Sequence, residues 1–322
     1  MAYPRYLQVP PNAPGTYHCV SRCVRRAFLC GDDAVSGRRF DHRKEWVEKR
    51  IIELASVFSM AVNAYAVMSN HFHLVIETDP NAPNFWSDDE VARRWLSLSS
   101  PAAKSNLSFA LRIAALSAQP ERLAVLRHRL GSLSWYMRFL KEPIARQANR
   151  EDECSGRFWE GRFRVQALLD DTSVLASMVY VDLNPIRAKI ASTPEQSLFT
   201  SICQRIQAAR HAEDEPIQPL ASSIDSQLSV VSTREYIELV EWTGRTLHPG
   251  RRGVIPSGTP SIVWRLGLRK KQWMFQVPAT ESHYRRAIGQ VDALIEFARL
   301  AGLKWLHGIG TARRVRRLSA SG

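Results

Sequence analysis

The stretch that decides the fold is residues 65–77, which read Tyr-Ala-Val-Met-Ser-Asn-His-Phe-His-Leu-Val-Ile-Glu. Two short apolar runs, residues 62–68 and 71–78, flank Ser69-Asn70. Both of these residues tolerate turn geometry. The stretch therefore predicts a β-hairpin whose second strand begins at His71.

That second strand opens with His71, Phe72 and His73. Successive side chains on a strand point to opposite faces, so both imidazoles are expected on one face and Phe72 on the other. Neutral imidazole is the commonest metal ligand among side chains. Histidines in strands also serve as hydrogen-bonded core or edge residues, so the triplet alone leaves both interpretations open.

Elements on either side of the hairpin complete a layered fold. Alternating or β-rich runs predict strands at 16–24 and 161–169, and helical spacing of apolar residues predicts helices at 41–58, 133–149 and 172–184. Asp171 or Thr172 is expected to cap the last of these helices, and Pro143 predicts a kink or a late start in the 133–149 helix. The order β-α-β-β-α-β-α predicts an α+β fold, with helices packed on a ferredoxin-like antiparallel sheet.

Composition divides the chain into parts. Residues 1–212 hold the predicted sheet, with a proline-punctuated helical insertion at about 79–130. Residues 213–232 are polar, with Pro and Ser, and predict a linker. Residues 233–322 predict a mostly helical basic region that binds DNA; a capping box at 232–235 opens its first helix and Gly244 would close it. Further helical stretches are expected at 260–266 and 281–300.

The charge balance favours a polyanionic partner. The chain carries 44 Lys and Arg against 31 Asp and Glu, a net charge of +13. We expect nucleic acid rather than a membrane, because no segment has the continuity of a spanning helix. A basic soluble enzyme is an equal alternative on charge alone. Basic clusters near Trp264, Trp273 and Trp305 favour DNA binding by the last region over a solvated basic face.

The N-terminus and the cysteines indicate the compartment. The first residues lack the apolar core of a secretion signal, so a cytoplasmic protein is expected. The five cysteines are odd in number and form no Cys-x-x-Cys pair. This pattern predicts reduced thiols rather than a disulfide framework or a zinc knuckle.

A second motif lies on the predicted 172–184 helix. Tyr180 and Asn184 are four residues apart, so they share a helix face and present a phenol and an amide together. The alternative is a rim aromatic and a helix-end cap. A tyrosine with its ordinary pKa near 10 is a poor nucleophile and needs help from a cation. A divalent metal held by two imidazoles and an amide oxygen would leave positions open for a phosphate oxygen and water.

The runs at 66–74 and 180–188 resemble the two signatures of single-tyrosine HUH transposases, especially the insertion-sequence-200-like, REP-associated tyrosine transposases. HUH denotes histidine, hydrophobic residue, histidine. The resemblance covers about residues 14–190 and makes 1–212 the catalytic domain. It implies that His71, His73 and Asn184 bind Mg²⁺ or Mn²⁺ and that Tyr180 is the nucleophile. It also implies a single-stranded DNA substrate with a hairpin or palindromic repeat, a 5′-phosphotyrosine and a free 3′-hydroxyl.

Six further residues are expected to contact DNA. Arginines could hold backbone phosphates and a tryptophan could stack on an unpaired base, although core packing is an equal alternative for the tryptophan. These residues are His18, Arg22, Arg157, Trp159, Arg162 and Arg164. Two other functions stay open: a catalytically silent DNA-binding regulator, and an HUH replication initiator or relaxase. The sequence does not decide between a monomer and a homodimer.

Overall fold

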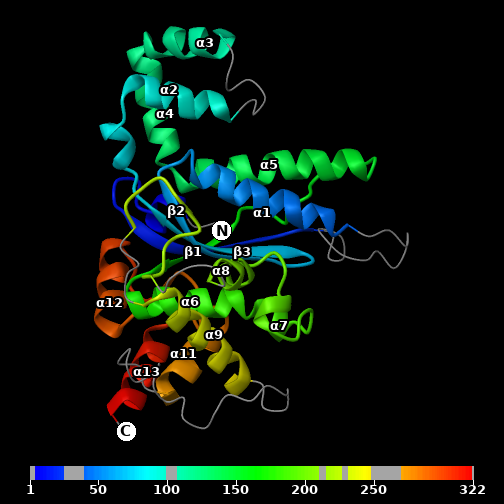
Figure 1. The fold of residues 1–322 in the computed structure, drawn as a ribbon. Coiled ribbons are helices and arrows are strands. Elements are labelled where there is room, and N and C mark those ends of the chain that lie inside the picture. The colour runs from blue at the N-terminus through cyan, green and yellow to red at the C-terminus, as the bar shows by residue number, and fades with distance from the viewer. Residues whose placement is uncertain are drawn as a thin grey trace.

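The computed structural model describes residues 4–24, 40–98, 107–209, 215–226, 231–247 and 270–320. Within these residues a six-stranded sheet has the order β5-β2-β3-β1-β4-β6, and helices cover both of its faces (Figure 1). The α+β class is therefore confirmed. The strands are β1 (Gly15–Arg22), β2 (Met60–Val67), β3 (His71–Thr78), β4 (Arg164–Leu168), β5 (Ala221–Ser222) and β6 (Ala287–Ile288).

The predicted hairpin is confirmed. Strands β2 and β3 are antiparallel, and the Met68 amide donates to the His71 carbonyl at 2.8 Å across the turn. Strand β1 pairs antiparallel with both β3 and β4. The apolar side chains that alternate with the histidines are buried, as predicted: Phe72 and Leu74 have no exposed surface.

The sheet is mixed rather than purely antiparallel. Strand β6 pairs with β4 in parallel, with Ala167 opposite Ala287 and Leu168 opposite Ile288. The expectation of an antiparallel sheet was wrong at this edge, because a segment late in the chain returns to the sheet and adds a strand there. A two-residue strand carries too little pattern to be recognised in the sequence.

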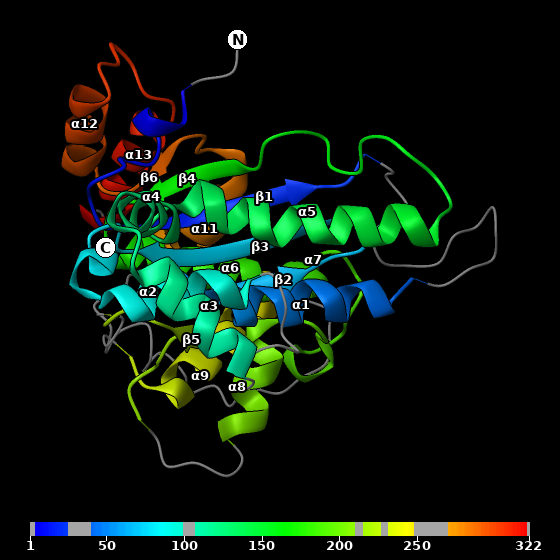
Figure 2. The ribbon, with the colours of Figure 1, turned by 90° about the horizontal axis from the view of Figure 1, so that it is seen from above.

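One face of the sheet is covered by α1 (His42–Ala55) and α5 (Leu133–Glu151), which run side by side (Figures 1 and 2). Helix α5 starts at Leu133 and continues through Pro143, so the predicted late start was wrong. Arg43 has no exposed side-chain surface and pairs with Glu151, the last residue of α5, and with Asp152, which follows it. This ion pair joins the start of α1 to the end of α5.

The insertion is helical, as predicted, and projects from one end of this layer (Figure 1). It contains η2 (Ala82–Phe85), α2 (Asp88–Ser97), α3 (Leu107–Ser117) and α4 (Pro120–Leu130). Ser87 caps α2 by accepting the Glu90 amide at 3.1 Å.

The other face is covered by a helical layer built around α6 (Asp171–Asp182) (Figure 1). Helix α6 contacts β2 and β3 on one side and α9 and α11 on the other, which explains why it is buried over most of its length. The remaining elements of the described chain are η1 (Arg5–Leu7), α7 (Asn184–Arg187), η4 (Pro194–Gln196), α8 (Ser201–Ala209), α9 (Thr233–Leu247), α11 (Lys270–Ser282), α12 (Val291–Leu300) and α13 (Ile309–Ala320).

Some predicted boundaries were wrong. Asp170, not Asp171 or Thr172, caps α6 by accepting the Ser173 amide at 2.8 Å. The capping box is confirmed, but Gly244 lies inside α9. A Cβ at Gly244 would lie 2.9 Å from Leu183, so close packing favours glycine there. The predicted 281–300 helix is not continuous: α11 ends at Ser282, β6 follows, and α12 begins at Val291. The predicted 260–266 helix falls outside the described residues.

The predicted linker contributes to the sheet. Ala221 and Ser222 form β5, which pairs with Val62 and Ala61 of β2. Of the helices that the structure describes, none has both the length and the apolar character needed to cross a membrane.

Candidate active site

Residues from three distant parts of the chain meet between the sheet and α6. The ring centroid of Tyr180 lies 5.8 Å from that of His73 and 6.0 Å from that of His18, and the His71 and His73 centroids are 4.9 Å apart. His18 comes from β1, the other histidines from β3 and the tyrosine from α6. The fold therefore brings the two sequence motifs into one site, and His18 joins them.

Burial keeps the histidines neutral. It lowers the pKa of His18 to about 4, and with the charge of Arg22 it lowers the pKa of His71 to about 4. Burial and the neighbouring histidines hold the pKa of His73 well below its ordinary value. Neutral imidazoles have a lone pair to offer a metal ion.

Each predicted histidine ligand has one ring nitrogen already bonded. His71 Nδ1 lies 2.6 Å from Asn70 Oδ1, and His73 Nδ1 lies 3.0 Å from His18 Nε2. His73 Nε2 is buried and has no hydrogen-bond partner within the described residues. A buried polar atom without a hydrogen-bond partner is uncommon, and the lone pair of a neutral imidazole can ligate a metal ion.

Asn184 follows α6 as the first residue of α7 and is 8 % exposed. Its Nδ2 is buried without a hydrogen-bond partner in the part of the chain that the structure describes. The oxygen and nitrogen of an amide are assigned from hydrogen bonding, so either end can occupy that position. Asn184 thus offers a second unsatisfied polar group one helical turn after Tyr180.

Tyr180 has two charged neighbours that sequence reasoning missed. Its hydroxyl donates to the carboxylate of Glu281 on α11, and the Arg187 guanidinium lies 4.5 Å from the centre of its ring. Burial first, and then the Glu281 hydrogen bond, raise the pKa of Tyr180 to about 12, whereas Arg187 acts in the opposite direction. In this arrangement the phenol is held protonated.

Glu281 is ionised in the same arrangement. Burial opposes its charge, but the hydrogen bond from Tyr180 and the charge of Arg187 lower its pKa below the ordinary value. Arg187 lies within the second sequence motif and could have been noticed there. Glu281 lies about a hundred residues later, in a region predicted only to bind DNA, and no local pattern marks it.

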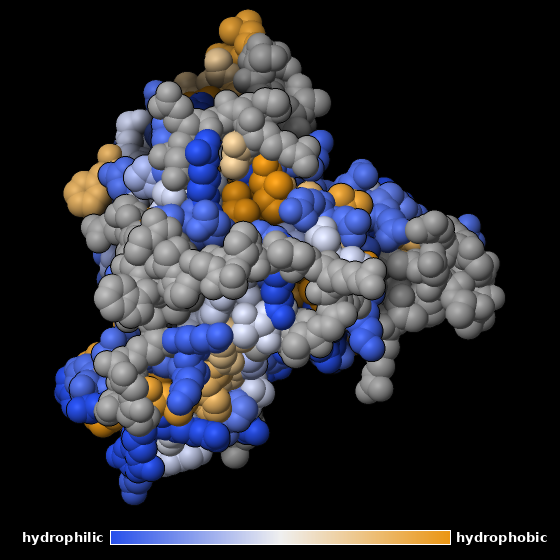
Figure 3. Space-filling model, turned by 60° about the horizontal axis from the view of Figure 1, so that its bottom comes forward, coloured by the Kyte–Doolittle hydropathy of each residue, from blue (hydrophilic) through white to orange (hydrophobic). Residues whose placement is uncertain are grey.

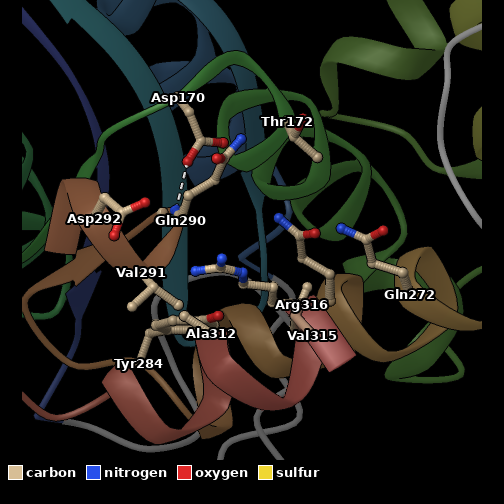
Figure 4. A pocket seen from close by; sticks show the side chains of 12 residues that line it. Asp170, Thr172, Gln272, Tyr284, Gln290, Val291, Asp292, Ala312, Val315 and Arg316 are labelled. Carbon is tan, nitrogen blue, oxygen red and sulfur yellow. Dashed lines mark hydrogen bonds between the residues drawn. The ribbon is translucent and has the colours of Figure 1, made fainter. Parts of the chain in front are cut away.

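Two aspartates, half-buried Asp170 and buried Asp182, fix the ends of α6. Asp170 also accepts the Gln290 amide at 2.8 Å, which joins the start of α6 to the start of α12 (Figure 4). This link borders a cavity of about 390 Å³, into which α11, α12 and α13 also contribute side chains. At the other end, Asp182 accepts from Ser201 and Tyr236 hydroxyls and from the Ile202 amide at 2.9 Å.

The six predicted DNA-contacting residues fall into different environments. His18 is 1 % exposed and belongs to the histidine cluster. Trp159 is also buried: its indole donates to the Lys141 carbonyl at 2.9 Å, and its ring packs on Phe72, so it occupies a core position. The arginines are at the surface, at the end of β1 and before and within β4; they are Arg22, Arg157, Arg162 and Arg164.

The C-terminal helices carry further positive charge. Arg313, Arg314 and Arg316 of α13 are exposed, and Figure 3 shows mainly hydrophilic residues on the lobe that holds these helices. The predicted aromatic partners differ: Trp273 is fully buried and Trp305 is 69 % exposed. Trp264, Arg251, Arg252 and Arg269 lie outside the described residues.

No three or more His, Cys, Asp or Glu side chains within the described ranges are arranged to hold a metal ion. The predicted ligand set contains only two such residues, because its third member is an amide.

No protein-family model and no curated protein matches this chain. Among solved structures, the fold is similar to that of a REP-associated tyrosine transposase bound to a REP hairpin. The TM-score is 0.38 and the sequence identity 14 %, over 71 % of this chain and 96 % of that one. We therefore base the functional assignment on the residues of the site.

Proposed function

We propose that this chain is a metal-dependent enzyme that cleaves and rejoins single-stranded DNA through a 5′-phosphotyrosine at Tyr180. The observation that carries the proposal is the meeting of His18, His71 and His73 with Tyr180, whose rings lie within about 6 Å of their neighbours. The pairing of β1 with β3 and the packing of α6 on the sheet bring these polar side chains, far apart in the sequence, into one buried site. The net charge of +13 supports a DNA substrate.

The sheet order supports the same assignment. Strands β2-β3-β1-β4 are consecutive neighbours with antiparallel pairings, and the chain enters α6 directly after β4. This is the order expected of a ferredoxin-like core, the fold that the sequence resemblance implies. We take β5 and β6 as additions at its two edges.

The residues present fit a divalent cation. His73 Nε2 and one end of the Asn184 amide are buried without partners among the described residues. His71, with its Nδ1 beside Asn70, has Nε2 left to ligate. We propose these three side chains as ligands of Mg²⁺ or Mn²⁺. When bound, the cation would withdraw charge from a non-bridging oxygen of the scissile phosphate.

The chain's own residues would carry out the transfer. The Tyr180 oxygen would form a bond to phosphorus while the bond from phosphorus to the 3′-oxygen breaks. The phenolic proton would leave Tyr180 and the 3′-oxygen would gain a proton, which yields a free 3′-hydroxyl. Arg187, above the Tyr180 ring, would favour the phenolate, because a nearby cation stabilises the anion. Reversal of the same step would rejoin the strand without ATP.

The test is a covalent adduct. Purified protein with Mn²⁺ and single-stranded DNA from the ends flanking its own gene should give a band that resists denaturation. Tyr180→Phe removes the nucleophilic oxygen and little else, so it should abolish the adduct and leave DNA binding intact. An undiminished adduct in Tyr180→Phe would remove this residue from the chemistry.

The second candidate is a DNA-binding regulator that cuts nothing. The buried, protonated state of Tyr180 beside Glu281 is the observation that favours it. Binding of hairpin DNA without any adduct in Mg²⁺ or Mn²⁺ would establish that function instead. An HUH initiator or relaxase ranks lower, because in this chain one motif tyrosine, Tyr180 with Asn184 four residues later, follows the histidines.

A further inference from the structure

The amide of Gln166 has only one permitted orientation. Its Nε2 donates to the carbonyl oxygens of Tyr284 at 2.8 Å and Thr280 at 3.2 Å. Turning the amide over would place its oxygen against two carbonyl oxygens, and acceptors repel one another. Gln166 Oε1 must therefore face His18 Nδ1, which lies 2.9 Å away.

This orientation fixes the proton on His18. An amide oxygen only accepts, so His18 Nδ1 must carry the hydrogen. The ring is 1 % exposed and its two hydrogen bonds go to an amide and an imidazole, neither of which compensates a buried positive charge. His18 is therefore neutral, and its Nε2 presents a lone pair.

The orientation of His18 also fixes which nitrogen of His73 carries the hydrogen. His18 Nε2 accepts, so His73 Nδ1, at 3.0 Å, must donate. A neutral imidazole with a hydrogen on Nδ1 has a lone pair on Nε2. That nitrogen is the buried atom without a partner in the described structure.

We propose that His18 and Gln166 are positioning residues that hold His73 as the Nδ1–H tautomer, so that Nε2 is directed at a divalent cation. The hydrogen-bonded chain begins at the Thr280 and Tyr284 carbonyls, so the segment around the end of α11 sets the metal affinity of a strand far earlier in the sequence. Hydrogen-bonded partners of metal ligands orient the rings and fix their tautomers. The inference rests on the proposed function and changes the predicted role of His18 from DNA contact to ligand orientation.

The first measurement is the tautomer itself. In the metal-free protein, nitrogen-15 NMR of the histidine rings should show a hydrogen on Nδ1 of His73 and a bare Nε2. A hydrogen on Nε2 of His73 would overturn the proposal. This readout needs neither metal nor DNA, so it separates failure of the positioning chain from failure of the proposed activity.

The second measurement is the affinity for Mn²⁺ in the absence of DNA. The electron paramagnetic resonance signal of unbound Mn²⁺ reports how much of the ion is bound. Gln166→Leu cannot accept from His18 and should weaken Mn²⁺ binding by about 10–100-fold, the usual effect of losing such a partner. Val165→Ala is the matched control: it is the neighbouring buried position on β4, on the opposite face, so it should lower stability and leave the affinity unchanged.

A second pair of variants distinguishes loss of the hydrogen-bond acceptor from misfolding. His18→Leu offers His73 no acceptor, whereas His18→Gln places an amide oxygen near the position of Nε2 and should recover much of the affinity. If Gln166→Leu and His18→Leu are folded and bind Mn²⁺ with wild-type affinity, the positioning role of His18 and Gln166 is refuted. If wild-type protein has the Nδ1–H tautomer and binds no Mn²⁺, the positioning chain stands and the metal in the proposed function fails.

Discussion

The buried carboxylate of Asp182 gives a prediction whose size follows from the structure. Burial is the main cause that raises its pKa from 3.8 to about 6, despite hydrogen bonds from Ser201 and Tyr236. At about 1.36 kcal/mol per pH unit, this difference is worth about 3 kcal/mol. The folded state binds the proton more tightly than the unfolded state. The contribution is therefore complete below pH 3.8 and is lost as the pH rises through 6.

Asp182→Asn removes this titration. Its Oδ1 can keep the bonds to Ser201 and Ile202, and its Nδ2 can donate to the Tyr236 hydroxyl. Between pH 4 and pH 7.5 the unfolding free energy of Asp182→Asn should therefore rise, relative to wild type, by about 2.5 kcal/mol. Urea unfolding of both proteins at the two pH values measures the difference, in which every other titrating group cancels.

Asp182→Ala is the companion variant. It leaves the Tyr236 hydroxyl and the Ile202 amide without an acceptor, whereas Ser201 can still donate to the Tyr65 carbonyl at 3.3 Å. Each lost acceptor costs at least about 1 kcal/mol, so Asp182→Ala should be about 2 kcal/mol less stable than Asp182→Asn. Equal stabilities of the Asn and Ala variants would show that the three hydrogen bonds do not anchor α6. An unchanged pH dependence in Asp182→Asn would contradict the burial of an ionisable carboxyl at this position.

The remaining predictions concern the site and the helix ends. Glu281→Gln removes a negative charge from beside the Tyr180 hydroxyl, so the pKa of the phenol should fall and the covalent adduct should form faster at pH 7.5. An adduct rate as low as that of Tyr180→Phe would instead make Glu281 the proton acceptor. The pKa of His18 is about 4 in the folded state against 6.5 ordinarily, so its contribution to stability is present above pH 6.5 and is lost as the pH falls through 4. Relative to His18→Gln, the unfolding free energy of wild type, measured with urea, should therefore fall by about 3 kcal/mol between pH 7.5 and pH 4. The same pH dependence in both proteins would contradict the burial of His18. Ser232→Ala breaks the capping box with Glu235 and should cost about 1 kcal/mol, whereas Ser232→Thr should keep most of it; equal urea midpoints for the two variants would argue against the cap.

Local patterns predicted the hairpin, the α+β class and the helical insertion, because each depends on residues close together in the sequence. The spacing of His71 and His73 placed their side chains away from buried Phe72, as a strand requires. Tyr180 lies in the last turn of α6 as predicted, but α6 ends at Asp182 and Asn184 begins α7, so the expectation that both share one helix was wrong. Periodicity was sufficient wherever an element was long enough to show it.

The missed features depend on contacts between distant residues. Nothing near Gln166 in the sequence marks it as a partner of His18, and nothing near Glu281 marks it as a partner of Tyr180. Asp182 lies among apolar side chains because its carboxylate accepts hydrogen bonds from donors on α8 and α9. Such side chains are recognisable only when the tertiary structure is known.

The return of the C-terminal segment to the sheet has a consequence for synthesis on the ribosome. Tyr180 emerges well before Glu281, and Gln166 has both of its acceptors only after Thr280 and Tyr284 have been made. Contacts of such long sequence separation form late in folding. A nascent chain therefore carries Tyr180 and the three histidines before Glu281 exists, and the candidate site is complete only after α11 and the residues just beyond it have been made.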